Sequence, residues 1–254
     1  TLPMNKRLEA GIRLYHAHRF EQALAEFREA EKEMPSSPEL DYYLGLSLTQ
    51  LGRHEEALLS LEKVVTSQFS FFHTMQARMV LGYVYAITAR HRLAQFEFQK
   101  VCDMLQSTQA FAALGYVLYA QHQIDESVEA LKKALEIDPR NANAMNSLGF
   151  IMCEERRDMA RGIQLCKKAV ELAPRNPAYH DSLGWAQFRA GHLDEAKATL
   201  RRADKDGFRA VAILGDDELA AGEVTVKDLA AGTQERVAAA AVPEWWKGKL
   251  TADS

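Results

Sequence analysis

Apolar residues recur at intervals of three and four positions along most of the chain, as they do on one face of an α-helix. Ala23, Phe27 and Ala30 lie along one such stripe. Short polar or glycine-containing segments, such as residues 51–54 and 190–192, interrupt the pattern. The sequence therefore predicts a series of amphipathic helices joined by short turns.

The helical pattern itself repeats with a period near 34 residues. An apolar residue followed directly by glycine occurs once in each period. Successive glycines of these pairs are 34, 37, 33, 34 and 35 residues apart. These glycines are Gly11, Gly45, Gly82, Gly115, Gly149 and Gly184. A larger apolar residue follows later in most periods, at Phe27, Leu61, Phe98, Leu131 and Leu200. Because glycine has no side chain to hold two backbones apart, the pattern predicts that two helices approach closely in each period.

Five of the seven prolines lie at the joins between periods, namely Pro35, Pro38, Pro139, Pro174 and Pro177. Proline lacks a backbone N–H and its ring clashes with the preceding turn, so the interior of a helix excludes it. None of the seven falls inside a predicted helix. The prolines therefore predict helix boundaries.

This arrangement resembles the tetratricopeptide repeat, whose unit is a helix-turn-helix of 34 residues. The resemblance implies an all-α, right-handed superhelical solenoid of six helix pairs, in which no pair buries its apolar face alone. Two departures predict local changes in the angle between repeats: repeat 2 has three extra residues around 69–72, and repeat 5 has one near 156–158. The repeats are placed at 4–37, 38–74, 75–107, 108–141, 142–176 and 177–210.

The remaining residues, 211–254, break the pattern and are interpreted as a C-terminal cap and tail. Residues 226–241 are compatible with one further helix, although Gly232 lies inside it. Trp245 and Trp246 are two of only three tryptophans in the chain. One hypothesis is that they anchor the tail in the groove of the solenoid, in cis as a cover or in trans as a homo-oligomer contact. The alternative is that they pack on the cap.

Charge and hydropathy exclude some partners. The formal net charge is −4, and residues 204–254 contain six basic and ten acidic residues. No basic cluster is present, so we expect no nucleic-acid partner. No apolar run approaches the 18 residues that cross a membrane. We expect a cytoplasmic protein; the alternative is an exported or periplasmic protein whose signal has been removed.

The sequence contains no recognisable catalytic or metal-binding motif. The three cysteines are odd in number and lack close spacing, and the eight histidines are dispersed. There is no glycine-rich phosphate loop and no nucleophile elbow. Cys153 has no evident base beside it and is interpreted as a small core residue. We therefore expect a non-enzymatic protein without cofactor or metal.

The family resemblance implies a different kind of site, because ligands of these repeats contact the concave face formed by the first helices. Mapped onto this chain, the ligand positions form a largely aromatic groove that is densest from repeat 3 to repeat 6. The predicted groove residues are Tyr83, Tyr116, Tyr119, Asn143, Asn146, Phe150, Asp181, Trp185 and Phe188. In the first three repeats the same mapping also places on this face Leu8, Ile12, Tyr15, Tyr42, Leu46, Thr49, Met79 and Ala86. Packing alone also explains the aromatic residues at 15, 119 and 188.

The residue types on this face favour one class of partner. Some tetratricopeptide proteins bind acidic chaperone C-termini through a Lys/Asn carboxylate clamp, but repeat 1 has Leu8 and Ile12 at those positions, and repeat 2 has Tyr42 and Leu46. An aromatic groove instead suits an apolar peptide or an amphipathic helix of another protein. We therefore expect an interaction scaffold or adaptor. The alternative is a carrier or sensor of a small hydrophobic ligand, held in the same groove or in an oligomeric pore.

Overall fold

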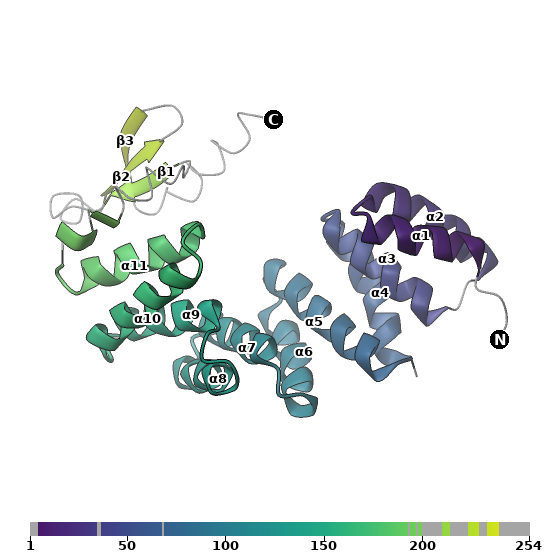
Figure 1. Ribbon diagram of the computed structural model, residues 1–254, viewed down its shortest axis with the longest axis horizontal. Coiled ribbons are helices and arrows are strands. Elements are labelled where there is room, and N and C mark those ends of the chain that lie inside the picture. Colours follow the sequence, from purple (N-terminus) through teal and green to yellow (C-terminus); the bar gives the residue numbers. More distant parts are fainter. Residues whose placement is uncertain are drawn as a thin grey trace. The chain divides into compact units, whose positions relative to one another are not determined.

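The computed structural model describes residues 5–34, 37–67, 69–192, 194–196, 198–199, 210–213, 223–228 and 233–238. The chain divides into two compact units, the N-terminal unit Thr1–Pro139 and the C-terminal unit Arg140–Ser254. The N-terminal unit contains α1 (Lys6–His16), α2 (Phe20–Glu33), α3 (Pro38–Gln50), α4 (His54–Thr66), α5 (Phe71–Ile87), α6 (His91–Met104), α7 (Thr108–Ala120) and α8 (Ile124–Ile137) (Figure 1). The C-terminal unit contains α9 (Ala142–Glu154), α10 (Met159–Leu172), α11 (Pro177–Arg189), β1 (Ala210–Ile213), β2 (Glu223–Asp228) and β3 (Thr233–Ala238).

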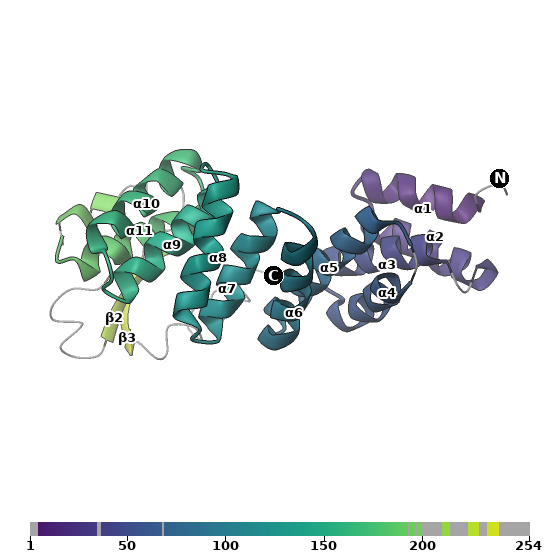
Figure 2. The same cartoon turned by 90° about the horizontal axis from the view of Figure 1, so that it is seen from below.

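The helices pack as consecutive antiparallel pairs, which confirms the predicted helix-turn-helix repeats (Figure 2). Each first helix packs on the second helix of its own repeat. Within the N-terminal unit the first helices α1, α3, α5 and α7 also contact one another in turn, as α9 and α11 do in the C-terminal unit. The first helices of each unit therefore share one face, which we call its first-helix face.

The turn inside each repeat contains one residue with a left-handed backbone conformation. These residues are His18, Gly52, Ala89, His122, Arg156 and Gly191, with φ between 51° and 78°. Their spacing is that of the first-helix glycines. Only two of the six are glycine, so the other four turns accept the steric cost that a Cβ has in this region. The left-handed conformation therefore recurs once in every repeat, whether or not the residue at that position is glycine.

The first helices begin at side-chain caps. Ser37, Ser107 and Asn141 each accept a hydrogen bond from a backbone N–H in the first turn of α3, α7 and α9. Such a cap satisfies a donor that the helix itself leaves unpaired. α5 differs, because Ser70 makes no such bond. α5 begins within the insertion, at Phe71, and is the longest described helix, with 17 residues.

The first-helix glycines allow the two helices of a repeat to cross closely. A Cβ added to Gly45 would lie 2.5 Å from Cγ of Leu61, and one added to Gly115 would lie 2.6 Å from Cγ of Leu131. The same pairing joins Gly11 to Phe27 and Gly82 to Phe98. All four large residues are almost completely buried. The glycine and the large residue of each sequence period are therefore packing partners.

Repeat 5 uses a different pair of residues at this crossing. A Cβ on Gly149 would lie 2.6 Å from the carbonyl oxygen of Gly162 and 2.8 Å from Sγ of Cys166. Gly162 and Cys166 occupy the places that alanine and a large residue have in other repeats. The two backbones of this repeat therefore meet directly, glycine against glycine.

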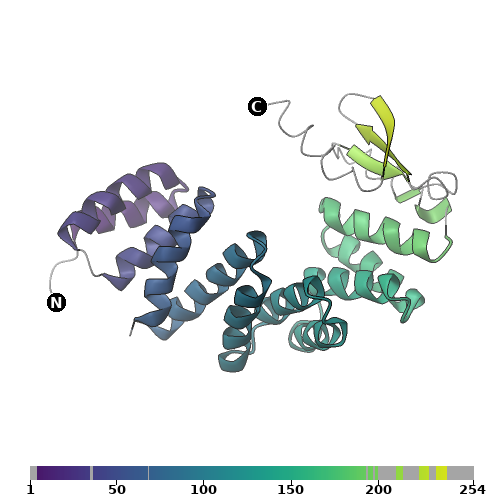
Figure 3. The ribbon, with the colours of Figure 1, turned by 180° about the vertical axis from the view of Figure 1, so that it is seen from behind.

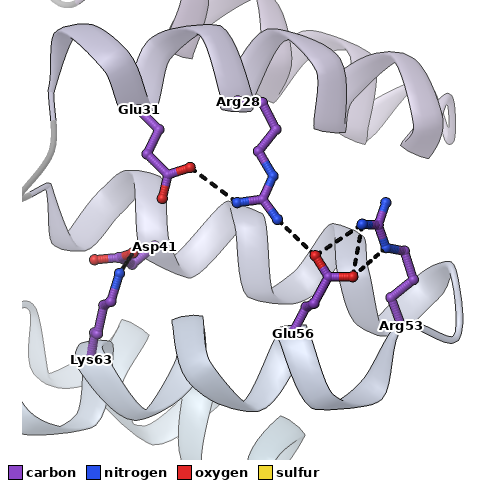
Figure 4. A network of polar contacts seen from close by, with 6 residues as sticks. All are labelled: Arg28, Glu31, Asp41, Arg53, Glu56 and Lys63. Atoms are coloured by element: carbon purple, nitrogen blue, oxygen red, sulfur yellow. Dashed lines mark hydrogen bonds and ion pairs between the residues drawn. The ribbon is translucent and has the colours of Figure 1, made fainter.

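Charged side chains link the repeats on the other side, through the second helices (Figure 4). Arg28 in α2 is paired with Glu31 at 3.0 Å and with Glu56 in α4 at 2.9 Å. Glu56 is also paired with Arg53 at 2.7 Å. Because these side chains are partly exposed, each pair contributes little to stability, about 0–1 kcal/mol. One of them, Arg28–Glu56, joins two adjacent second helices.

The C-terminal unit contains three described strands, and β2 and β3 correct the expectation of a helix over residues 226–241. β2 pairs antiparallel with β1 and with β3, so the sheet order is β1-β2-β3 (Figure 3). Gly232 itself lies outside the described residues. Val226 and Thr225 point to opposite faces of the sheet, as neighbours in a strand do, and both are buried. The predicted end of repeat 6 at residue 210 coincides with the first residue of β1.

We predict that Gly149→Ala destabilises the chain by about 1–3 kcal/mol through overpacking, which exceeds the ~1 kcal/mol that alanine gains over glycine in a helix. The carbonyl oxygen of Gly162 cannot move away from the new methyl group without shifting α10. Urea unfolding followed by circular dichroism measures the change. Ala160→Ser, at an exposed site in α10, is the control and should leave the midpoint unaltered. Equal midpoints for all three proteins would contradict the close crossing.

Candidate functional site

The first helices of repeats 3 and 4 are almost devoid of charge. α5 and α7 together contain one charged residue, Arg78. Its guanidinium is paired with the buried carboxylate of Glu97 in α6, with 2.6 Å between Nη1 and Oε2. Charged residues make up 26% of the whole chain, so their depletion here is specific to this face. The first-helix face of the N-terminal unit is therefore electrically neutral along α5 and α7.

The same face exposes large apolar side chains. Exposed fractions are 52% for Phe71, 62% for Phe72, 47% for Tyr83, 64% for Ile87 and 57% for Tyr116. Four of these residues belong to α5 and one to α7. We call these five residues the apolar band. Monomeric proteins seldom expose several large apolar side chains together unless the surface contacts another molecule.

A hollow opens at the first half of α5. Its volume is about 640 Å³, within the range of small-ligand sites. It is lined by Tyr15, Tyr42, Leu46, Phe71, Phe72, Met75, Gln76, Met79, Val80, Val101, Leu105, Ser107 and Gln109. None of these residues is charged, and the polar groups are hydroxyls and side-chain amides. The hollow thus offers an apolar wall with a few neutral hydrogen-bonding groups.

Aromatic contacts fix the wall of the hollow beside α3. The Tyr42 hydroxyl donates a hydrogen bond to Oε1 of Gln76. The ring of His73 lies 4.9 Å from Tyr42, 4.9 Å from Phe69 and 5.6 Å from Phe72, measured between centroids. Burial raises the pKa of Tyr42 to about 12, so this hydroxyl stays protonated at neutral pH. The wall is therefore formed by packed rings that join residues 69–73 to α3.

The predicted groove residues are divided between the two units. Tyr83, Tyr116 and the half-buried Tyr119 belong to α5 and α7 of the N-terminal unit, and the other six belong to α9 and α11. Within the N-terminal unit, Tyr83 and Tyr116 are exposed as predicted for ligand contacts. Their role in binding stays a prediction.

In the C-terminal unit, Trp185 is held by contacts between repeats. Its Nε1–H donates to Oε2 of Glu154 at 2.7 Å, and its ring lies 5.7 Å from that of Phe188. Nη2 of Arg189 donates to the main-chain oxygen of Glu154 at 2.8 Å, and the guanidinium lies 5.8 Å from the Trp185 ring. These contacts join the ends of α9 and α11. The indole N–H is therefore already used inside the protein.

The polar groove residues also lie on α9 and α11. Nδ2 of Asn146 donates to Oγ of Ser182 at 3.1 Å, while its Oδ1 is buried without a hydrogen-bond partner. Asn143 and Asp181 are exposed, and Phe150 is half-buried. Asn146 therefore retains one acceptor that a ligand N–H would satisfy.

Residues Phe71 and Phe72 were missed as candidate site residues. They belong to the three-residue insertion of repeat 2, which interrupts the alignment by which ligand positions are read. The same mapping did place Tyr15, Tyr42, Leu46 and Met79 on the ligand face, and all four line the hollow. The insertion itself, Phe-Ser-Phe-Phe at 69–72, was the available signal. Trp245 and Trp246 lie outside the described residues, and their role stays a prediction.

The cysteines have no nucleophilic geometry. Cys153 and Cys166 are completely buried and Cys102 nearly so. Burial raises the pKa of Cys166 to about 12 and that of Cys153 to about 11. The Cys153 Sγ–H donates weakly to the oxygen of Met159 at 3.7 Å. Among the described residues, no group of three or more His, Cys, Asp and Glu side chains has the arrangement of a metal site.

Comparisons with known proteins agree with the fold. A tetratricopeptide repeat family model matches residues 8–69, and a TPR repeat model matches 115–154. A tetratricopeptide repeat protein from Parabacteroides merdae superposes with a TM-score of 0.68 at 14% identity, covering 80% of this chain and 79% of that one. YrrB, described as a TPR protein with an unusual peptide-binding site, has a TM-score of 0.57 at 20% identity, covering 68% of this chain and 88% of that one.

A third family model, the anticodon binding domain, matches residues 188–249. A curated relative, the histidine–tRNA ligase of Solidesulfovibrio magneticus, is 46% identical over 57 residues, which is 22% of this chain and 14% of that protein. The chain thus spans about a seventh of the length of this relative. Residues 188–249, matched by this family model, include the end of α11 and the three described strands. Sequence reasoning had assigned most of this span to a cap and tail.

No helix among the described residues is long and apolar enough to span a membrane.

We predict that Cys102, Cys153 and Cys166 do not react with Ellman's reagent in the native protein at pH 8. Their thiols are buried and their raised pKa values keep them protonated, whereas the thiolate is the reactive form. All three should react in 6 M guanidinium chloride, which serves as the control. Rapid reaction of one thiol in the native protein would show an accessible nucleophile.

Proposed function

The chain belongs to the tetratricopeptide repeat family, and we propose that it is a non-enzymatic scaffold that binds an apolar segment of another protein on the first-helix face of its N-terminal unit. The observation that carries this proposal is the uncharged apolar band beside a hollow of about 640 Å³. Protein interfaces concentrate their binding energy in aromatic and bulky apolar anchors that fill such hollows.

The chemistry of the lining supports an uncharged partner segment. No charged side chain lines the hollow, so an incoming charge would lose its hydration without gaining a partner. Gln76 and Gln109 are exposed at this site, and their amides match the N–H and C=O groups of a peptide backbone. An extended, uncharged segment with bulky apolar side chains would place those side chains in the hollow and its backbone groups beside the two amides.

We predict that Phe71→Ser combined with Phe72→Ser weakens binding of such a segment at least tenfold. Peptides would be selected from a random phage-displayed library on the full chain, and the affinity of a selected peptide measured by fluorescence anisotropy. Removal of the two phenyl rings should remove their contribution to the binding free energy. The fold should stay intact, because neither side chain is buried. Affinity should change less than about twofold between 50 and 500 mM salt, since no charge lines the hollow.

Leu59→Ser is the matched control, because Leu59 is also a large exposed apolar residue but lies on the second helix α4, outside the hollow. It should leave affinity unchanged. Unaltered binding by the phenylalanine double variant, with a native circular dichroism spectrum, would refute the proposed site. An apolar small molecule retained by the wild-type protein in native mass spectrometry, and lost from the double variant, would favour the carrier function instead.

The anticodon binding domain match raises a second candidate, binding of a transfer RNA by residues 188–249. This span contains ten Lys and Arg residues against eleven Asp and Glu residues, whereas RNA binding relies on an excess of cationic side chains. We therefore predict no saturable complex below about 100 µM with a fluorescent histidine transfer RNA at 150 mM salt. A submicromolar complex in anisotropy titrations would establish this second function.

A further inference from the structure

Some of the hydrogen-bonding groups that line the hollow are already used inside the protein. The polar side chains of the lining are those of Tyr15, Tyr42, Gln76, Ser107 and Gln109. The Tyr42 hydroxyl donates to Oε1 of Gln76. The carbonyl of this amide is therefore engaged, and its Nε2 group is the part that remains for a ligand.

Gln109 repeats this arrangement at the start of α7. The Ser107 hydroxyl oxygen accepts from the backbone N–H of Ala110 at 3.2 Å, and the hydroxyl donates to Oε1 of Gln109 at a longer 3.4 Å. Both glutamines are exposed. They occupy the same place relative to the first-helix glycine of their repeat, Gly82 or Gly115. The hollow thus presents two amide donors, one from each of two successive repeats.

The main-chain acceptors between α6 and α7 are also used. The carbonyl oxygen of Val101 accepts from the N–H of Leu105 at 2.8 Å, and that of Leu105 accepts from Ser107 at 2.9 Å. The carbonyl oxygen of Ser107 accepts from Phe111 at 3.0 Å. A partner N–H that entered the hollow would lose its hydration and meet acceptors that are already engaged. The hollow therefore favours a segment that brings carbonyl groups but few N–H groups.

Proline is the residue that supplies a backbone carbonyl without an N–H. The wall of the hollow suits its ring, because four aromatic side chains line it, Tyr15, Tyr42, Phe71 and Phe72. Grooves lined by aromatic rings bind proline-rich segments in the polyproline II conformation. Such a segment is extended before it binds, so it loses less conformational entropy than a flexible peptide does.

The spacing of the two donors also matches this conformation. Gln76 lies in α5 and Gln109 in α7, and these two helices contact each other. The axes of contacting helices are about 8–10 Å apart. A polyproline II helix has three residues per turn, so carbonyl groups three residues apart lie on one side with about 9 Å between them. Two carbonyl groups of one segment are therefore spaced to accept from both amides.

We propose that the partner segment bound on the first-helix face of the N-terminal unit is proline-rich and binds as a polyproline II helix. Its rings pack on the aromatic wall of the hollow, and two of its carbonyl groups accept from Nε2 of Gln76 and of Gln109. This inference rests on the proposed scaffold function and narrows its partner class. Apolar contact alone does not require proline, so the proline content of the ligand separates the two statements.

Fluorescence anisotropy of the full chain with three labelled nonapeptides tests the preference for proline. The first peptide consists of three Leu-Pro-Pro repeats, the second has alanine at every proline position, and the third has N-methylalanine there. We expect the first to bind at least tenfold more tightly than the second, whose additional N–H groups find no free acceptors. The third lacks the same N–H groups and should bind at least threefold more tightly than the second.

Two substitutions in the protein test the donors. Gln76→Glu keeps an oxygen for the Tyr42 hydroxyl but replaces the Nε2 donor by a second oxygen, and Gln109→Glu makes the same exchange in α7. Each should weaken binding of the Leu-Pro-Pro peptide about tenfold. The matched control is Gln164→Glu, at an exposed site in α10, which adds the same charge and should leave the affinity unchanged. Circular dichroism checks that all variants keep their helix content.

Equal affinities for the proline and alanine peptides would overturn the inference, as would wild-type affinity for the proline peptide in both Gln76→Glu and Gln109→Glu. Failure here is distinguishable from failure of the scaffold function. If library-selected peptides bind and require Phe71 and Phe72, but the Leu-Pro-Pro peptide does not bind, the scaffold function holds and the preference for proline is wrong. If neither kind of peptide binds, both proposals fail.

Discussion

The close crossing of two helices at a glycine is the constraint on which the rest of the structure depends. In the first four repeats a buried Phe or Leu of the second helix lies against that glycine, and in repeat 5 two glycine backbones meet. A side chain at this point would separate the helices and expose the small and large apolar residues that seal the pair. Because the same contact recurs in the first four pairs, these pairs present similar edges for stacking on the next.

This packing leaves the two sides of the helix pairs with different chemistry. The second helices carry most of the charge, as in α2, where Arg28 is paired with Glu31 and with Glu56 of the next repeat. The first helices α5 and α7 have a single charged residue, and it is paired with α6. An apolar face of this kind gains energy only when something covers it.

Most of the fold followed from the sequence because glycine, proline and helix periodicity act locally. The glycines predicted the close crossings, whereas the residues packed against them, such as Leu61 and Phe98, came from the structure. The hollow could not be predicted in full from the repeat pattern, because it depends on Phe71 and Phe72. These residues lie in an insertion, where the repeat positions can no longer be aligned. Conversely, Trp185 fits the ligand register, but its N–H is bound to Glu154. Register alone does not distinguish a side chain that faces a ligand from one that joins two repeats. Placement of the nine predicted groove residues in binding stays a prediction.

The strands show where helical reasoning fails. Residues 226–241 contain many alanines and allow a helical reading, yet Val224, Val226 and Val237 lie in paired strands. Strand pairing is a contact between segments, so a single segment's composition does not reveal it. A repeat array has no intrinsic end, because every pair leaves an apolar face for the next. Here the match to the anticodon binding domain model begins at residue 188, inside α11, so the sequence changes from one family pattern to another within the last described helix pair.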